Sequence, residues 1–148
     1  MKRALLAAGL ALLVGCGGDD PEPKLPAPQS GSAQERAIRG WSAALNRGDY
    51  GEAADFFARG AVVEQVREFR LRDHKAAEEF NRSLPCRADV TDVKKEGGSV
   101  VAAFRLKPGT GPSESCGGDA RVRFRFRGDR FSEWRQLPEP SEPDGNVI

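Results

Sequence analysis

Few side chains in this 148-residue chain are suited to acid–base or metal chemistry. His74 is the only histidine and Tyr50 the only tyrosine. His74 directly follows Asp73, a residue type that caps helices, and Tyr50 stands at the start of an apolar helical pattern. Both positions favour capping or packing over catalysis. The chain has no CxxC pair and therefore lacks the clustered Cys and His ligands of a zinc site. We predict no metal site and no cofactor.

Four carboxylates remain as candidates for a general base: Asp55, Glu64, Glu68 and Asp89. Alternation along a strand can turn one or two of them inward, and burial raises the pKa of a carboxyl group toward neutrality. No second catalytic partner stands near them in the sequence. A solvated strand face explains the same residues, so we assign no catalytic residue.

A second kind of chemistry is suggested by arginines that alternate with apolar residues near the end of the chain. Period-two alternation predicts a strand with one cationic face. Its members are Arg121, Arg123, Arg125 and Arg127, and Arg105 and Lys107 can extend the row on a neighbouring strand. One interpretation is docking of an anionic lipid or cell-wall polymer. The other is an exposed face with cross-strand partners such as Glu133, which also discourages aggregation.

The first 15 residues have the order of a secretory signal. Lys2 and Arg3 precede an apolar run of about 11 residues, which is too short to span a bilayer as a helix. Export would remove these two cations and lower the formal net charge from +1 to about −1. Such a balance does not predict a nucleic-acid partner.

The end of this segment, Leu13-Val14-Gly15-Cys16, resembles the bacterial lipobox. The resemblance implies cleavage before Cys16 and acylation of its thiol, which would tether the chain to a cell membrane on the extracytoplasmic side. A plain secretory signal followed by a chance cysteine is the alternative. In the oxidising compartment that export implies, the two remaining thiols, Cys86 and Cys116, are most simply interpreted as a disulfide.

Composition divides the rest of the chain into a domain and two flanking segments. Residues 16–31 combine the lipidated cysteine with a linker rich in proline, glycine and charge, and residues 138–148 have the composition of a disordered tail. The predicted domain covers residues 32–137. Its capping box at Ser32 and Glu35 begins a helix that ends at Gly48, and a second helix follows Asp49 and runs to Gly60.

The remaining elements are mainly strands. A run over residues 61–72 predicts one strand or a strand with an interruption. Asp73 begins a third helix, and Pro85 ends it. Alternating strands follow after Cys86, and Gly128-Asp129 predicts a two-residue hairpin turn between the last two. The tripeptide Arg127-Gly128-Asp129 matches a cell-adhesion motif, but we interpret it as part of this turn. Phe131 and Trp134 can both face the core only if the last strand carries a bulge. This order predicts an α+β domain with helices on one face of a curved, mostly antiparallel sheet.

Two segments resemble nuclear transport factor two-like domains, also called SnoaL-like. They are the helix pair that begins at Trp41 and contains Ala44-Leu45-Asn46-Arg47-Gly48-Asp49-Tyr50, and the hairpin from Phe124 to Trp134. The resemblance covers roughly residues 32–137. It implies a cone-shaped, cystatin-like fold around an apolar cavity, and dimerisation through the outer sheet face in some members.

From this resemblance we expect a membrane-tethered domain that binds an apolar or amphipathic small ligand, or a protein partner, without catalysis. The expected cavity wall is aromatic and comprises Trp41, Phe57, Phe69, Phe80, Phe104 and Phe124. The alternative is an isomerase or cyclase that uses a cavity carboxylate as its base. Fold alone does not choose between these functions.

Overall fold

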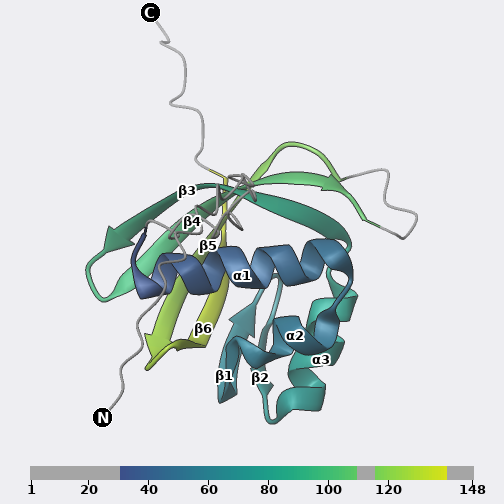
Figure 1. Ribbon diagram of the computed structural model, residues 1–148, viewed down its shortest axis with the longest axis vertical. Coiled ribbons are helices and arrows are strands. Elements are labelled where there is room, and N and C mark those ends of the chain that lie inside the picture. The colour runs from purple at the N-terminus through teal and green to yellow at the C-terminus, as the bar shows by residue number, and fades with distance from the viewer. Residues whose placement is uncertain (1–30, 110–115, 140–148) are drawn as a thin grey trace, which may run out of the picture.

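The computed structural model describes residues 31–109 and 116–139. Three helices lie on one face of a curved six-stranded sheet (Figure 1). The helices are α1 (Ala33–Arg47), α2 (Tyr50–Asp55) and α3 (His74–Ser83). The strands are β1 (Phe57–Glu64), β2 (Glu68–Leu71), β3 (Cys86–Glu96), β4 (Ser99–Pro108), β5 (Asp119–Arg127) and β6 (Arg130–Leu137). This arrangement confirms the predicted α+β class.

The sheet has the strand order β2-β1-β6-β5-β4-β3. All neighbouring strands pair antiparallel except β1 and β6, which run parallel and thereby join the first hairpin to the last. The long β3–β4 hairpin forms the far end of the sheet (Figure 1). The sheet is therefore mostly antiparallel, as predicted.

The helix boundaries follow from capping. Ser32 Oγ accepts a hydrogen bond from Glu35 N at 3.1 Å, and Gly48 ends α1 with a φ of 73°, a left-handed conformation that suits glycine. Asp49 caps α2 and Asp73 caps α3 in the same way, each through its carboxylate.

The second helix is shorter than predicted. We expected it to continue through Phe57 to Gly60, but it ends at Asp55 and Phe57 begins β1. Parallel pairing with β6 explains the difference, because Phe57 lies opposite Phe131 and the Phe131 N–H donates to Phe56 O at 2.7 Å. A long-range strand partner here outweighs a local helical spacing.

The predicted bulge lies in the β5–β6 hairpin. Phe126 pairs with Phe131 and Arg125 with Glu133, so one residue of β6, Ser132, has no opposite residue. The extra residue allows Phe131 and Trp134 both to face the helices, where each is at most 3% exposed.

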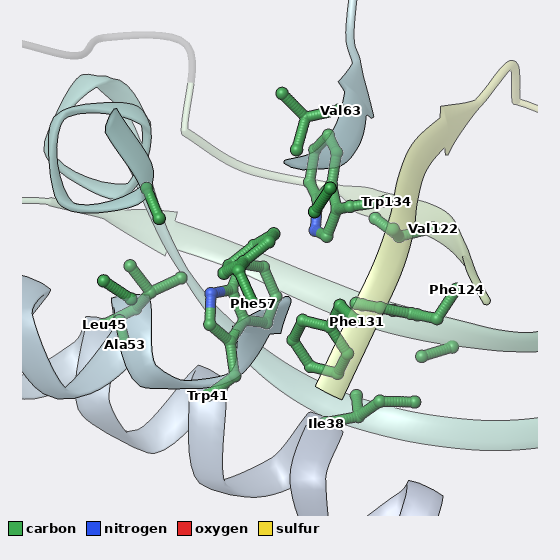
Figure 2. Close-up of a cluster of buried hydrophobic side chains, with 14 of the residues drawn as sticks. Ile38, Trp41, Leu45, Ala53, Phe57, Val63, Val122, Phe124, Phe131 and Trp134 are labelled. Carbon is green, nitrogen blue, oxygen red and sulfur yellow. The ribbon is translucent and has the colours of Figure 1, made fainter. Parts of the chain in front are cut away.

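One apolar core joins the helices to the sheet, and Figure 2 shows its centre. The ring of Trp41 lies edge-on to five other aromatic rings, at centroid distances of 5.9–6.4 Å. These partners are Phe57, Phe104, Phe124, Phe131 and Trp134. Every buried residue of this core lies between Ile38 and Trp134, so the segment that carries the helices and strands contains its own core and is expected to fold independently.

Several predictions concern residues outside the described ranges. The leader, Cys16, most of the linker and residues 140–148 belong to this group. Within residues 31–109 and 116–139, no helix is long and apolar enough to cross a membrane.

Candidate functional site

An apolar cavity lies between the second half of α1, the start of β3 and the inner faces of β4, β5 and β6. We call it the Trp41–Trp134 cavity after two residues of its wall. Its volume is about 140 Å³. The lining residues are Trp41, Leu45, Gln65, Leu84, Pro85, Cys86, Ala88, Phe104, Leu106, Ala120, Val122, Trp134 and Gln136.

A buried amide fixes the position of Trp41. The indole N–H of Trp41 donates to Asn81 Oδ1 at 2.9 Å, and Asn81 Nδ2 donates to the carbonyl oxygen of Ala77 at 2.9 Å. Asn81 is fully buried, and α3 supplies both it and Ala77. The Trp41 wall of the cavity is therefore locked between α1 and α3 by satisfied polar groups.

Trp134 differs from Trp41 in its hydrogen bonding. It is 3% exposed and packs edge-on against Phe80 at 5.2 Å. Its Nε1 atom is buried and has no hydrogen-bond partner among the described residues. An indole N–H in an apolar environment favours an acceptor, so this atom is a buried polar group that the described residues leave unsatisfied.

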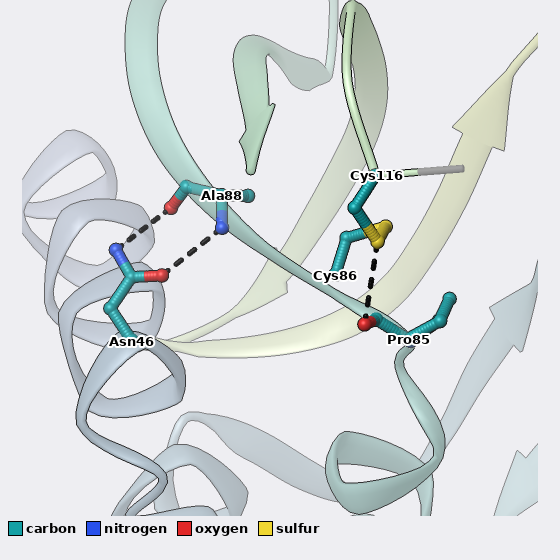
Figure 3. The surroundings of a disulfide bond; sticks show 5 residues. All are labelled: Asn46, Pro85, Cys86, Ala88 and Cys116. Carbon is teal, nitrogen blue, oxygen red and sulfur yellow. Dashed lines mark hydrogen bonds between the residues drawn. A yellow bond between two sulfur atoms is a disulfide. The ribbon is translucent and has the colours of Figure 1, made fainter. Parts of the chain in front are cut away.

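The wall formed by the start of β3 is held from two sides (Figure 3). A disulfide joins Cys86 to Cys116, as predicted. Asn46 of α1 makes two bonds to the backbone of Ala88: its Nδ2 donates to the carbonyl oxygen, and its Oδ1 accepts from the N–H, both at 3.0 Å. Cys116 Sγ also lies 3.4 Å from Pro85 O, which is a packing contact because a disulfide sulfur carries no proton.

None of the four candidate carboxylates lines this cavity. Asp55 is exposed and lies 3.0 Å from Nε2 of His74, and Asp89 is exposed and bonded to Lys107 Nζ at 2.7 Å. His74 borders a separate pocket of about 350 Å³ beside Phe57. The sole tyrosine, Tyr50, packs against the core and lies under the guanidinium of Arg82.

Glu64 and Glu68 face away from the helices. Val63 is buried on the inner face, so its neighbour Glu64 projects from the outer face, and Glu68 lies opposite Glu64 on β2. Arg135 binds both carboxylates and also Glu133, whose Oε1 is 2.8 Å from Arg135 Nε. Hydrogen bonds to Glu133 and Glu64 raise the pKa of Arg135 further above its ordinary high value, so it remains cationic.

The predicted aromatic wall separates into three groups. Trp41 and Phe104 line the cavity. Phe57, Phe80 and Phe124 pack in or against the core behind it.

Phe69 does not belong to the wall. It lies on the short edge strand β2, is 53% exposed, and sits beneath the guanidinium of Arg67 at 5.7 Å. Of the strand β2 only Leu71 is buried, so the inward-facing position of Phe69 lies beyond the part of this strand that the core covers.

Sequence reasoning missed the two glutamines and Trp134 as cavity residues. Trp134 had a signal, because the predicted bulge turns it inward. Gln65 lies in the turn between β1 and β2, and Gln136 lies on β6 opposite Val122. Nothing in their local sequence indicates that they meet at one cavity.

The arginine row lies on the outer face, opposite the inward-facing Val122, Phe124 and Phe126. Arg125 lies 3.9 Å from Glu133, and Arg127 donates to the carbonyl oxygen of Arg59 at 3.0 Å. The described part of the chain contains no group of three or more His, Cys, Asp or Glu residues that can hold a metal ion.

Most of the domain matches the model of a known protein family. Residues 38–134 match the family model described as a SnoaL-like domain. No curated protein matches the chain.

Solved structures with the same fold share little sequence with it. An uncharacterised cystatin-fold protein from Novosphingobium aromaticivorans has 16% identity and a TM-score of 0.57, over 73% of this chain and 100% of that one. A protein provisionally named a ketosteroid isomerase, from Kribbella flavida, has 19% identity and a TM-score of 0.58, over 77% and 84%. A protein provisionally named a polyketide cyclase, from Sinorhizobium meliloti, has 12% identity and a TM-score of 0.57, over 72% and 99%. At these identities the likeness concerns the fold.

Proposed function

Because the chain belongs to the SnoaL-like domain family, we propose that its domain binds one small apolar molecule in the Trp41–Trp134 cavity, without acid–base catalysis. The observation that carries this proposal is the cavity lining. Its described residues are apolar apart from two glutamine amides and one indole N–H, and none of them carries an ionisable group, since Cys86 is in a disulfide. Such a surface favours burial of apolar area and offers no general base.

Cavity size limits the ligand. A volume of about 140 Å³ is close to that of an engineered apolar cavity of about 150 Å³ that binds benzene. Pockets for drug-sized ligands have volumes of roughly 300–1,000 Å³. The proposed ligand is therefore a single ring or a short branched chain.

Polar groups limit the ligand's chemistry. Trp134 Nε1 lacks an acceptor, and the exposed side chains of Gln65 and Gln136 border the same cavity. A ligand with one carbonyl or hydroxyl oxygen accepts a hydrogen bond from a glutamine amide at the edge of the cavity, because the indole N–H is buried away from the cavity surface. The amphipathic ligand class expected from the sequence fits this description better than a pure hydrocarbon.

The alternative function is that of an isomerase or cyclase, as two of the provisionally named structural neighbours suggest. Such a mechanism requires an inward carboxylate beside the ligand. Glu64, Glu68 and Asp89 have ion-pair partners away from the cavity, and Asp55 is hydrogen-bonded to His74 outside it, which favours binding over proton transfer.

Membrane tethering through Cys16 completes the proposed function. The lipobox-like Leu13-Val14-Gly15-Cys16 supports an exported lipoprotein with this domain on the extracytoplasmic side. In that location the domain would sample small amphipathic molecules near the membrane surface. For macromolecular partners, we propose that the outer face of the sheet binds another protein or a second copy of this chain.

Cavity binding is tested with residues 32–148 and toluene as a single-ring probe, followed by tryptophan fluorescence because two tryptophans line the cavity. Ala120→Leu adds bulk to a half-buried lining residue, and we expect it to weaken toluene binding at least about tenfold. Ala43→Leu makes the same change at an exposed position of α1 and leaves binding unchanged. Equal binding by wild type and Ala120→Leu, or no binding by wild type, contradicts the proposal.

A further inference from the structure

The outer face of the sheet contains a pair of arginines that stand apart from the rest of the row. Arg121 and Arg123 lie two residues apart on β5, and both are half-buried. On β4 their cross-strand neighbours are Ala103 and Val101, which carry no charge. On β6 they lie opposite Leu137 and Arg135. None of these neighbours is acidic.

Each nearby carboxylate bonds to a cation other than Arg121 or Arg123, and three of them share one arginine and form an acidic group around it. Glu64, Glu68 and Glu133 bind Arg135. Asp119 binds Arg105 at 2.5 Å, and Asp89 binds Lys107 at 2.7 Å. Within residues 31–109 and 116–139, no carboxylate lies within 4.0 Å of the guanidinium of Arg121 or Arg123.

Arg121 also has an unsatisfied donor. Its Nε atom is buried and has no hydrogen-bond partner among the residues that the structure describes. Its Nη2 atom makes one long bond, of 3.3 Å, to the carbonyl oxygen of Pro138. The guanidinium of Arg121 is therefore incompletely paired by the protein, and because the residue as a whole is half-buried, the rest of this cationic group favours an anion at the outer face.

We propose that Arg121 and Arg123 form a binding site for a phosphate group on the outer sheet face. Residues two apart on a strand are about 6–7 Å apart at Cα, so one tetrahedral anion can lie between the two guanidinium groups. A guanidinium pairs with two oxygens of one anion in a planar fork, and a phosphate offers enough oxygens for two such forks. A carboxylate is satisfied by one arginine. The phosphate belongs either to a lipid headgroup or to a soluble phosphate ester.

The test uses residues 32–148 and inorganic phosphate, at ionic strength matched with chloride. Binding is followed through the Nε–Hε resonances of the arginines in ¹⁵N-labelled protein. We expect the Arg121 resonance to move on titration, and Arg121→Gln/Arg123→Gln to weaken phosphate binding at least about tenfold. Arg105→Gln/Arg127→Gln is the matched control, because it removes two cations from the same face at positions that already have partners.

Comparison with the control variant gives the result that would contradict the proposed phosphate site. If both double variants weaken phosphate binding equally, the effect is net charge and the proposal is wrong. It is also wrong if no arginine resonance of the wild type responds to phosphate. Arg121→Lys/Arg123→Lys keeps the charge but loses the planar fork, so we expect it to bind less tightly than wild type. Thermal unfolding of each variant confirms that the fold is intact.

Vesicles then identify the source of the phosphate. Sedimentation with phosphatidylglycerol vesicles but not with phosphatidylcholine vesicles, lost in Arg121→Gln/Arg123→Gln, assigns the site to an anionic lipid headgroup. Equal sedimentation with both vesicle types, together with arginine-dependent phosphate binding, assigns it to a soluble phosphate ester. The site is separate from the Trp41–Trp134 cavity, so Ala120→Leu leaves phosphate binding unchanged.

Discussion

At the scale of single residues, two asparagines of the helices organise the cavity. Asn81 holds the ring of Trp41, and Asn46 holds the backbone of Ala88. Each side chain uses both its amide donor and its carbonyl acceptor, so the polar groups of both asparagines are paired. These polar contacts position an otherwise apolar wall.

Replacing Asn81 with leucine should destabilise the domain by about 2–3 kcal/mol. The substitution leaves the buried Trp41 N–H without an acceptor, and such a group costs about 1–3 kcal/mol. Urea unfolding of Asn81→Leu measures the loss. In a Trp41→Phe background the N–H is already gone, so the same substitution should cost less. Equal costs in both backgrounds would show that the bond contributes nothing.

Gln136 should distinguish ligands that differ by one oxygen. In Gln136→Leu an exposed amide at the edge of the cavity is removed, so benzaldehyde should bind about fivefold more weakly while toluene affinity changes little. Isothermal titration with both probes measures the ratio of the affinities. Trp134→Phe is the control, because its indole N–H is buried away from the cavity surface and the two probes should be affected equally. An unchanged ratio in Gln136→Leu excludes a hydrogen bond from this amide.

At the scale of elements, the sequence predicted best where local rules act alone. The caps at Ser32, Asp49 and Asp73 and the stop at Gly48 needed no tertiary information. The end of α2 was missed because β6, more than 70 residues later in the chain, recruits Phe57 into a strand. Local periodicity carries no information about such a partner.

Cavity residues were harder to predict than secondary structure for the same reason. Phe69 is aromatic, as expected of a wall residue, but it lies on the edge strand β2 outside the part that the core covers. Gln65 and Gln136 come from distant parts of the chain and meet only after the sheet forms. The arginine row was visible as a pattern, but only the pairing of neighbouring strands separates Arg121 and Arg123 from the arginines that have partners.

The disulfide should stabilise the domain through the start of β3. It closes a loop of 30 residues, which corresponds to about 3–4 kcal/mol in the chain-entropy model. We expect Cys86→Ser/Cys116→Ser to lose roughly this free energy of unfolding in urea titrations. Asn46 still anchors Ala88 in this variant, so the native fold should persist. A loss below about 1 kcal/mol would show that the loop ends are already held without the bridge.

At the scale of the whole molecule, the proposed tether and the domain are separable. Cys16→Ala should move the protein from the membrane fraction to the soluble fraction of its host, since a lipid on this thiol is the proposed anchor. Cell fractionation with an antibody against the domain measures this change. Cys86→Ser/Cys116→Ser keeps Cys16 and should remain in the membrane fraction. Membrane retention of Cys16→Ala would place the anchor elsewhere.

Assembly is also decided at this scale. The outer face combines an acidic group around Arg135 with the Arg121–Arg123 pair, so two copies related by a two-fold axis could place unlike charges together. If this dimer forms, added phosphate competes with it for the arginines. The mass of the intact protein with and without phosphate reports this competition.

The most direct test of ligand binding is native mass spectrometry of residues 32–148 secreted from the host that makes the protein. We expect a bound small molecule in the mass range of a single ring or short chain, present in wild type and absent from Ala120→Leu. Retention of the same molecule by Ala120→Leu would place it outside the Trp41–Trp134 cavity. Ligand-free protein that also fails to bind toluene would contradict ligand binding in this cavity, and the function would then lie at the outer face of the sheet.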